Sequence, residues 1–235
     1  MSAVQLTLEL GHHPALEGQD YLVAPGNAEA VSWLEAGRHW SAPALVLSGP
    51  PGAGKSHLAR LWAARERAAM LRADALTVDV LPELVPDSGT VVIDDADAVA
   101  GEPGRERALL HLFNLIAERG GRLLLVARPP AARWRVVLPD LDSRLRAAAS
   151  TAIAPPDDEL LAAMLVKLLA DRQLQPPAEL VAYLVPRMER SFDAARRLVG
   201  ALDRAALAAH RPLTLPLARS VLAELARSES GRSES

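Results

Sequence analysis

The sequence predicts an α/β domain built on a parallel sheet, followed by a small all-helical domain. Two features indicate this fold. Short apolar runs alternate with helical patterns up to about residue 155, which is typical of a parallel sheet covered by helices on both faces. Beyond the Pro-rich stretch at 154–158, only helical patterns follow. We therefore expect an α/β base at 14–155 and a helical domain at 156–226, with an N-terminal tail at 1–13 and a disordered tail at 227–235.

The individual elements follow from local patterns. Apolar runs predict strands at 44–48, 70–72, 90–94, 122–127 and 151–153. Helical spacing predicts helices at 27–36, 55–67, 105–119 and 140–147 in the base, and at 157–172, 177–188, 191–210 and 214–226 beyond it. Asn27 is the expected N-cap of the first helix, and Gly120-Gly121 the expected end of the third.

Composition narrows the class of protein. Of the 235 residues 50% are hydrophobic, so a core can form without metal or disulfide bonds. The absence of cysteine excludes disulfides and thiolate metal sites and fits a reducing cytoplasm. A net charge of -3 argues against direct sequence-specific DNA binding. No apolar run approaches the roughly 20 residues of a transmembrane helix, and the first residues lack the pattern of a secretion signal, so we expect a cytoplasmic protein without membrane contact.

A glycine-rich loop joins the first predicted strand to the next helix. Its sequence GPPGAGKS matches the phosphate loop G-x₄-G-K-S, in which backbone N–H groups and a helix N-terminus face phosphate oxygens. Lys55 would contact the β- and γ-phosphates and Ser56 would ligate Mg²⁺. Lys55 is one of only two lysines in an arginine-rich chain, so a compact ammonium is favoured there. The alternative, a chance Gly-rich turn, is disfavoured by the flanking strand and helix. The predicted ligands are ADP or ATP with Mg²⁺, bound by Gly49, Pro50, Pro51, Gly52, Ala53, Gly54, Lys55, Ser56 and His57.

An acidic turn follows the predicted strand 90–94, in the run VVIDDAD. Asp94 would hold Mg²⁺ through water beside the phosphates, and Asp95 would orient or activate the attacking water. The alternative is a strand that ends at a solvated acidic turn.

These motifs together resemble one family. GPPGAGKS, VVIDDAD, a strand followed by RPP, PDLDSRL at 139–145 and RRLVGAL at 196–202 resemble the AAA+ module of the replication initiator family DnaA, over roughly residues 20–226. The chain is more similar still to the short Hda group of this family. It ends after the expected helical lid, and it begins with QLTLEL, which resembles the sliding-clamp-binding peptide of that group.

The resemblance implies roles for further residues. Arg144, in PDLDSRL, would be the arginine finger that reaches a neighbouring subunit's nucleotide, and Arg196 the sensor 2 arginine that contacts the chain's own nucleotide. Tyr21 to Val23 would hold the adenine ring. The sensor 1 position, at the end of strand 122–127, lacks the small polar residue that usually helps to place the attacking water. Hydrolysis by the chain itself is therefore expected to be weak.

The resemblance also implies a function. A nucleotide-bound negative regulator of replication initiation would stimulate ATP hydrolysis by the initiator DnaA, together with the sliding clamp. Gln5 would bond to a pocket rim of the clamp while Leu6, Leu8 and Leu10 fill apolar grooves; alternatively these leucines pack on their own domain. A self-sufficient AAA+ ATPase such as a helicase loader, and an adaptor that recruits DnaA without stimulating it, remain open. So does association into a homodimer or homo-oligomer.

Overall fold

The computed structural model describes residues 21–36, 40, 42–209 and 212–230. They fall into two compact units, which divide between Ala154 and Pro155. We call the first unit the base and the second the lid, and each is described by itself.

The base contains a five-stranded parallel sheet in the order β2-β3-β4-β1-β5. The strands are β1 (Ala44–Ser48), β2 (Ala69–Arg72), β3 (Thr90–Asp94), β4 (Arg122–Val126) and β5 (Ala149–Ala152). The predicted parallel α/β fold is confirmed, with a strand at each of the five expected places. β4 lies between β1 and β3, so the phosphate loop after β1 and the acidic turn after β3 flank the end of the same strand.

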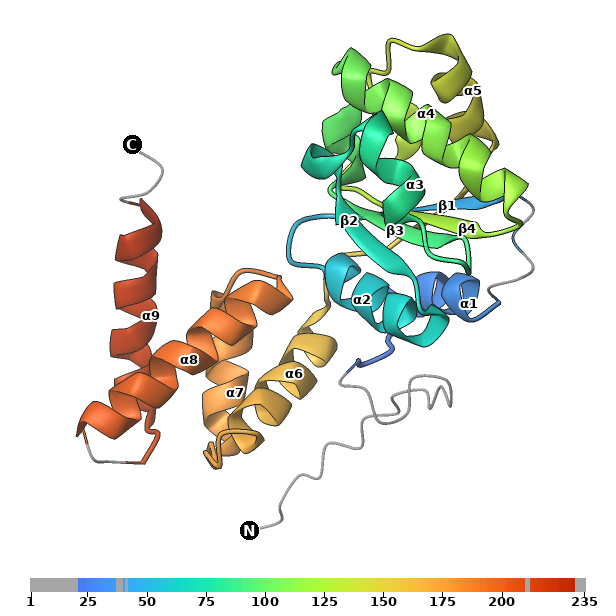
Figure 1. Ribbon diagram of the computed structural model, residues 1–235. Helices are drawn as coiled ribbons and strands as arrows, with labels where there is room; N and C mark the ends of the chain where they lie inside the picture. The colour runs from blue at the N-terminus through green and yellow to red at the C-terminus, as the bar shows by residue number, and fades with distance from the viewer. Residues whose placement is uncertain (1–20, 37–39, 41, 210–211, 231–235) are drawn as a thin grey trace. The chain divides into compact units, whose positions relative to one another are not determined.

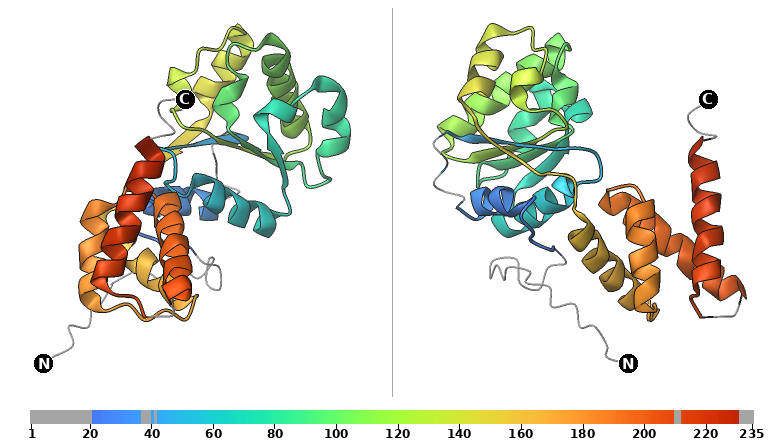
Figure 2. Two further views of the ribbon diagram at one scale, coloured as in Figure 1. Left: turned by 90° about the vertical axis from the view of Figure 1, so that its left-hand side faces the viewer. Right: turned by 180° about the vertical axis from the view of Figure 1, so that it is seen from behind.

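Helices cover both faces of the sheet (Figures 1 and 2). α1 (Ala28–Ala36) and α2 (Lys55–Glu66) lie on one face; α3 (Leu81–Leu84), α4 (Pro103–Glu118) and α5 (Pro139–Ala147) lie on the other. The short helix α3 was not predicted.

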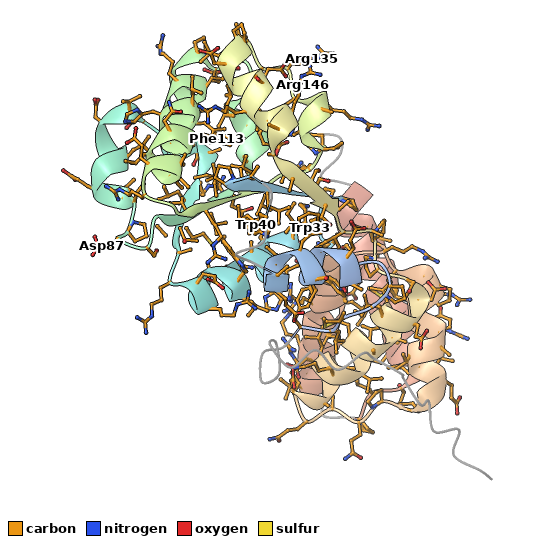
Figure 3. All side chains as sticks on the ribbon, turned by 90° about the vertical axis from the view of Figure 1, so that its right-hand side faces the viewer. Trp33, Trp40, Asp87, Phe113, Arg135 and Arg146 are labelled. Atoms are coloured by element: carbon orange, nitrogen blue, oxygen red, sulfur yellow. The ribbon has the colours of Figure 1, made fainter. Side chains whose placement is uncertain are left out.

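Successive strand residues alternate between these two layers, as the strand geometry requires. The α4 and α5 layer packs on Val46, Ile93 and Leu125, whereas the α1 and α2 layer packs on their neighbours Leu47, Val92 and Leu124. All six side chains are fully buried. In Figure 3 the labelled Phe113 lies on one side of the sheet, and Trp33 and Trp40 lie on the other.

Asn27 directly precedes α1, as predicted for its N-cap, and its carbonyl accepts from the Val31 N–H at 3.0 Å, but its side chain bonds to the preceding segment. Its Oδ1 accepts a hydrogen bond from the Ala24 backbone N–H at 2.9 Å, and its Nδ2 donates to the Leu22 carbonyl at 2.9 Å. The Asn27 side chain therefore fastens the segment that precedes the helix. An asparagine at this place serves either purpose, and the sequence pattern does not distinguish them.

Arg122 links α2 to the start of β4. Its guanidinium lies 5.4 Å from the centre of the Trp62 ring and forms an ion pair with Glu66 at the end of α2. Trp40 stacks on Trp62 with ring centres 5.4 Å apart. These tryptophans are core and packing residues, at the amino end of β4 and away from the loop that follows β1.

The lid consists of α6 (Asp158–Ala170), α7 (Ala178–Leu184), α8 (Phe192–Ala209) and α9 (Leu215–Ser230). Asp157 caps α6, since its carboxylate accepts from the Leu160 N–H at 2.8 Å. α9 runs to Ser230, past the boundary expected at residue 226. No helix within the described ranges has both the length and the apolar character to cross a membrane. The buried apolar side chains include Leu160, Leu161, Leu165, Leu169, Leu180, Leu184, Leu198, Val199, Leu202 and Ala218.

Candidate nucleotide site

The loop from Gly49 to Gly54 has a backbone that only glycine allows at its first position. Gly49 has φ 151°, and a Cβ added there would lie 2.4 Å from the Ile153 carbonyl oxygen. Gly54 has φ 93° at the N-cap of α2. The Gly49 N–H donates to the Arg128 carbonyl at 3.2 Å, which fixes the start of the loop against the end of β4. The loop thus lies at the carboxyl edge of the sheet, where α/β folds bind their ligands.

Lys55 begins helix α2 and is 8% exposed. Its Nζ donates to the Pro50 carbonyl at 2.8 Å, so the ammonium folds back over the loop. Burial lowers the pKa of Lys55, and the nearby charge of Arg128 lowers it further, while Asp94, Asp97 and Asp95 act in the opposite direction. A bound phosphate would stabilise this partly desolvated cation.

Ser56 and Asp94, the two predicted Mg²⁺ ligands, are brought together. The Ser56 hydroxyl donates to Asp94 Oδ1 at 3.1 Å, and the same oxygen accepts from the Asp95 N–H at 3.1 Å. A hydroxyl and a carboxylate are hard oxygen donors, which fits Mg²⁺. In the described part of the chain, no group of three or more His, Cys, Asp or Glu side chains could hold a metal ion. Mg²⁺ is often held by one or two protein ligands together with substrate phosphates and water.

Asp95, the predicted water-activating residue, is engaged by an arginine that the sequence did not single out. Arg72 at the end of β2 forms a 3.2 Å ion pair with the Asp95 carboxylate. Asp95 also adopts a left-handed backbone, φ 53°, which is uncommon outside glycine and concentrates at functional sites. The pair is exposed to solvent, so it orients Asp95 more than it stabilises the fold.

The sensor 1 position was expected at the end of β4. Ala127 lies there, and its side chain is not polar. That residue is 1% exposed and packs in the core. Arg128 follows it with an exposed side chain, and its backbone N–H donates to the Asp97 carboxylate at 3.3 Å.

The segment predicted to hold adenine lies against the helix that follows the phosphate loop. The ring of Tyr21 stacks on that of His57 with centres 5.7 Å apart and an interplanar angle of 28°. Burial raises the pKa of Tyr21 well above its ordinary value. Val23 is buried in the same layer. An aromatic ring and an apolar residue beside the loop suit a planar base.

Arg144 lies on the exposed side of α5, which buries Leu141 and Leu145 on its other side. Its guanidinium donates to Asn114 Oδ1 on α4 at 3.1 Å. Arg196 lies on α8 of the lid, where it pairs with Asp193 at 3.3 Å. The remaining predicted residues, Gln5, Leu6, Leu8 and Leu10, lie outside the described residues.

Sequence reasoning missed Glu106, which is fully buried on α4. Its carboxylate accepts from the N–H groups of Gly101, Val137 and Leu138, the last two just before α5. Burial acts to raise the pKa of Glu106, but these hydrogen bonds outweigh it and lower the pKa below its ordinary value. A signal was present: Glu106 shares the helical spacing of the apolar Leu109 and Phe113, where a carboxylate is out of place.

Two comparisons place this chain among known proteins. The sequence pattern of the family described as "Hda, lid domain" matches residues 157–222. Domain III of the Thermotoga maritima replication initiation protein DnaA is similar in structure, with a TM-score of 0.74 and 19% identity, over 90% of this chain and 97% of that domain.

Two longer proteins are also similar. AMPPCP-bound DnaA from Aquifex aeolicus has a TM-score of 0.62 and 18% identity over 77% of this chain; this chain spans 62% of that protein. The Thermotoga maritima RuvB Holliday junction branch migration motor has a TM-score of 0.69 and 14% identity, over 86% of this chain and 70% of that protein. The parallel sheet, the phosphate loop with its acidic turn and the matched lid agree with these findings. The chain thus has a DnaA-like AAA+ fold, and its residues 157–222 match the Hda lid domain family.

Proposed function

We propose that this chain is a nucleotide-binding negative regulator of DNA replication initiation, which stimulates ATP hydrolysis by the initiator DnaA through Arg144. The match to the Hda lid family and the likeness to DnaA support this choice of process. The proposal depends on one observation: the base carries two different functional features. One is a phosphate loop suited to binding a nucleotide, and the other is the exposed Arg144 on the separate helix α5.

The chain's own site is better suited to holding a nucleotide than to hydrolysing it. The loop, Lys55 and the Ser56–Asp94 pair supply what binding needs. The end of β4 offers only a buried Ala127 where a polar side chain would place water, and Asp95 is paired with Arg72. These features disfavour the self-sufficient ATPase, such as a helicase loader.

The proposed ligand is ADP or ATP with Mg²⁺. The AMPPCP-bound DnaA of similar fold supports an adenine nucleotide. Tyr21 and Val23 would contact the base of the nucleotide, the loop would cradle its phosphates, and Arg196 would serve as the sensor 2 arginine. Bound Mg²⁺ would neutralise phosphate charge.

The proposed chemistry takes place in a partner's site. An arginine supplied from a neighbouring subunit stabilises the charge that develops during phosphoryl transfer, and is worth about 10³–10⁵ in rate. Arg144 suits this role because it lies on the solvent side of α5 and its guanidinium donates, among the described residues, to the neutral amide of Asn114. Residues 1–10, with Gln5 and the three alternating leucines, would tether the chain to the sliding clamp.

The test is ATP hydrolysis by DnaA in the presence of this chain and of sliding clamp loaded on DNA. Arg144→Ala is expected to melt and bind ADP like the wild type but to lose the stimulation. Arg146→Ala is the matched control, since Arg146 is an exposed arginine on the same helix, paired with Asp142. Full stimulation by Arg144→Ala would refute the finger assignment. A wild-type chain that binds DnaA without stimulating it would instead be an adaptor.

A further inference from the structure

Glu106 joins two segments of the base that are distant in sequence. Its carboxylate accepts from the Gly101 N–H at 2.8 Å, at the end of the segment that follows the acidic turn. It also accepts from the Val137 N–H at 3.0 Å and the Leu138 N–H at 2.8 Å, where the chain enters α5. One side chain thus connects the acidic turn of the candidate nucleotide site to the helix that carries Arg144.

The segment between Asp94 and Gly101 is short and bonded to itself. It forms the 3₁₀ helix η5 (Ala96–Val99), in which the Ala98 N–H donates to the Asp95 carbonyl at 2.9 Å. The side chains at both ends of this helix are fully buried. The separation between Asp94 and Gly101 is therefore nearly fixed, and Glu106 places the start of α5 relative to the turn that would hold Mg²⁺.

The start of α5 depends on Glu106 because its own residues cannot cap it. The N-cap residue Leu138 has an apolar side chain, and Pro139 at the first helical position has no N–H. Val137 is 63% exposed, so water could bond to the backbone in this segment. Water would satisfy these N–H groups without fixing their position, whereas a buried carboxylate that accepts from both of them fixes it.

The position of α5 sets the position of Arg144. The two helices α4 and α5 lie side by side on one face of the sheet (Figures 1 and 2). Glu106 of α4 holds the entrance of α5, and Asn114 of α4 accepts from Arg144 in its last turn at 3.1 Å. A shift of the entrance would move the whole short helix, and a misplacement of about 1 Å can cost about a hundredfold in rate.

We infer that Glu106 is a positioning residue for Arg144, which holds α5 at the place from which Arg144 reaches the nucleotide of DnaA. This inference rests on the function proposed above, in which Arg144 acts in a partner's site. Glu106 is fully buried, so it acts through α5 and not by contact with the partner.

The experiment measures ATP hydrolysis by DnaA, with sliding clamp loaded on DNA, at increasing concentrations of this chain. Glu106→Gln keeps the size of the side chain, removes its charge and replaces one acceptor oxygen by a donor. The maximal stimulated rate is expected to fall by about tenfold to a hundredfold. The concentration of chain that gives half-maximal stimulation should change by less than about threefold, because the surface of the chain is unaltered.

This division of the effect distinguishes positioning from a loss of stability. A less stable chain has a smaller folded fraction, so a higher concentration restores the full rate. Leu34→Ala is the matched control, because Leu34 is buried on α1, in the layer on the other face of the sheet from α4 and α5. This variant loses packing without touching α5, and at saturation it should reach the wild-type rate.

Glu106→Asp keeps the charge but withdraws it by one methylene, so its maximal rate should lie between those of Glu106→Gln and wild type. If Glu106→Gln does not fold, Glu106→Asp decides the question by the same comparison. A wild-type maximal rate for the folded Glu106 variant, or an equal fall for Leu34→Ala, overturns the inference and leaves the proposed function standing. If the wild-type chain gives no stimulation, the proposed function fails and the inference fails with it.

Discussion

At the scale of single residues, the groups of the candidate nucleotide site form hydrogen bonds within the site itself. Ser56 and Asp94 share a hydrogen bond across the width of one strand, and Lys55 bonds to its own loop. These contacts keep the binding groups in place, so less ordering entropy is lost when a nucleotide arrives. The same contacts must be exchanged for contacts with phosphate and metal.

Asp94→Asn tests the metal role at this scale. The amide keeps the shape of the side chain but loses the negative charge that Mg²⁺ attracts. ADP affinity measured with Mg²⁺ should fall by about tenfold, whereas affinity in EDTA should change little. An equal loss under both conditions would mean that Asp94 serves the loop structure and not the metal.

The sequence pattern pointed to Ser56 and Asp94, which the structure brings within hydrogen-bond distance, because both follow buried strands of the same sheet. It was not sufficient for Arg72, Arg128 or Glu106. The pairing of Arg72 with Asp95 depends on β2 lying beside β3, which no local pattern encodes. The placement of Arg128 likewise depends on the position of β4 between two strands that are distant in sequence.

At the scale of elements, Glu106 ties helix α5 to helix α4. The N–H groups of Val137 and Leu138 precede the first turn of α5, where helical partners are lacking, and the buried carboxylate accepts from both. It also accepts from Gly101, in the segment that leads away from the acidic turn. One side chain thus sets the start of the helix that carries Arg144.

Glu106→Gln should lower the free energy of unfolding by about 2–4 kcal/mol at neutral pH, because charge-assisted hydrogen bonds in a buried place are lost. The folded-state pKa of Glu106 lies below its ordinary value of 4.5, so its contribution is present above that pH and is lost as the pH falls through the folded value. The stability gap between wild type and variant should therefore narrow below about pH 4.5.

Denaturant unfolding at a series of pH values checks this expectation. Glu118→Gln, an exposed glutamate on the same helix, is the control and should change stability little at any pH. If the difference in unfolding free energy between wild type and Glu106→Gln stays constant down to pH 3, the carboxylate charge does not stabilise the start of α5.

At the scale of the whole molecule, the proposed function assigns separate roles to the base, the lid and the N-terminal segment. The pattern of strands and then helices predicted the first two, because the hydrophobic period changes near residue 155. The role of Arg196 came from the resemblance alone, because periodicity does not say what a side chain contacts.

The N-terminal segment is expected to serve binding and not folding. Deleting residues 1–10, or changing Gln5 and Leu6 to Ala, should abolish binding to the sliding clamp in a pull-down or calorimetric assay. Thermal stability and ADP affinity should remain close to wild type. A loss of more than about 2 kcal/mol in stability would indicate instead that the leucines belong to a hydrophobic core.

The strand order also has a consequence for biosynthesis. β1 pairs with β4 and β5, so the strand that leads into the phosphate loop has neither neighbour until residues 122–126 and 149–152 have been made. During translation this apolar strand therefore stays unpaired while β2 and β3 are synthesised, and those two strands can pair with each other. The nucleotide site is therefore among the last parts of the base to form, and a nascent chain truncated before β4 would expose the strand most in need of a chaperone.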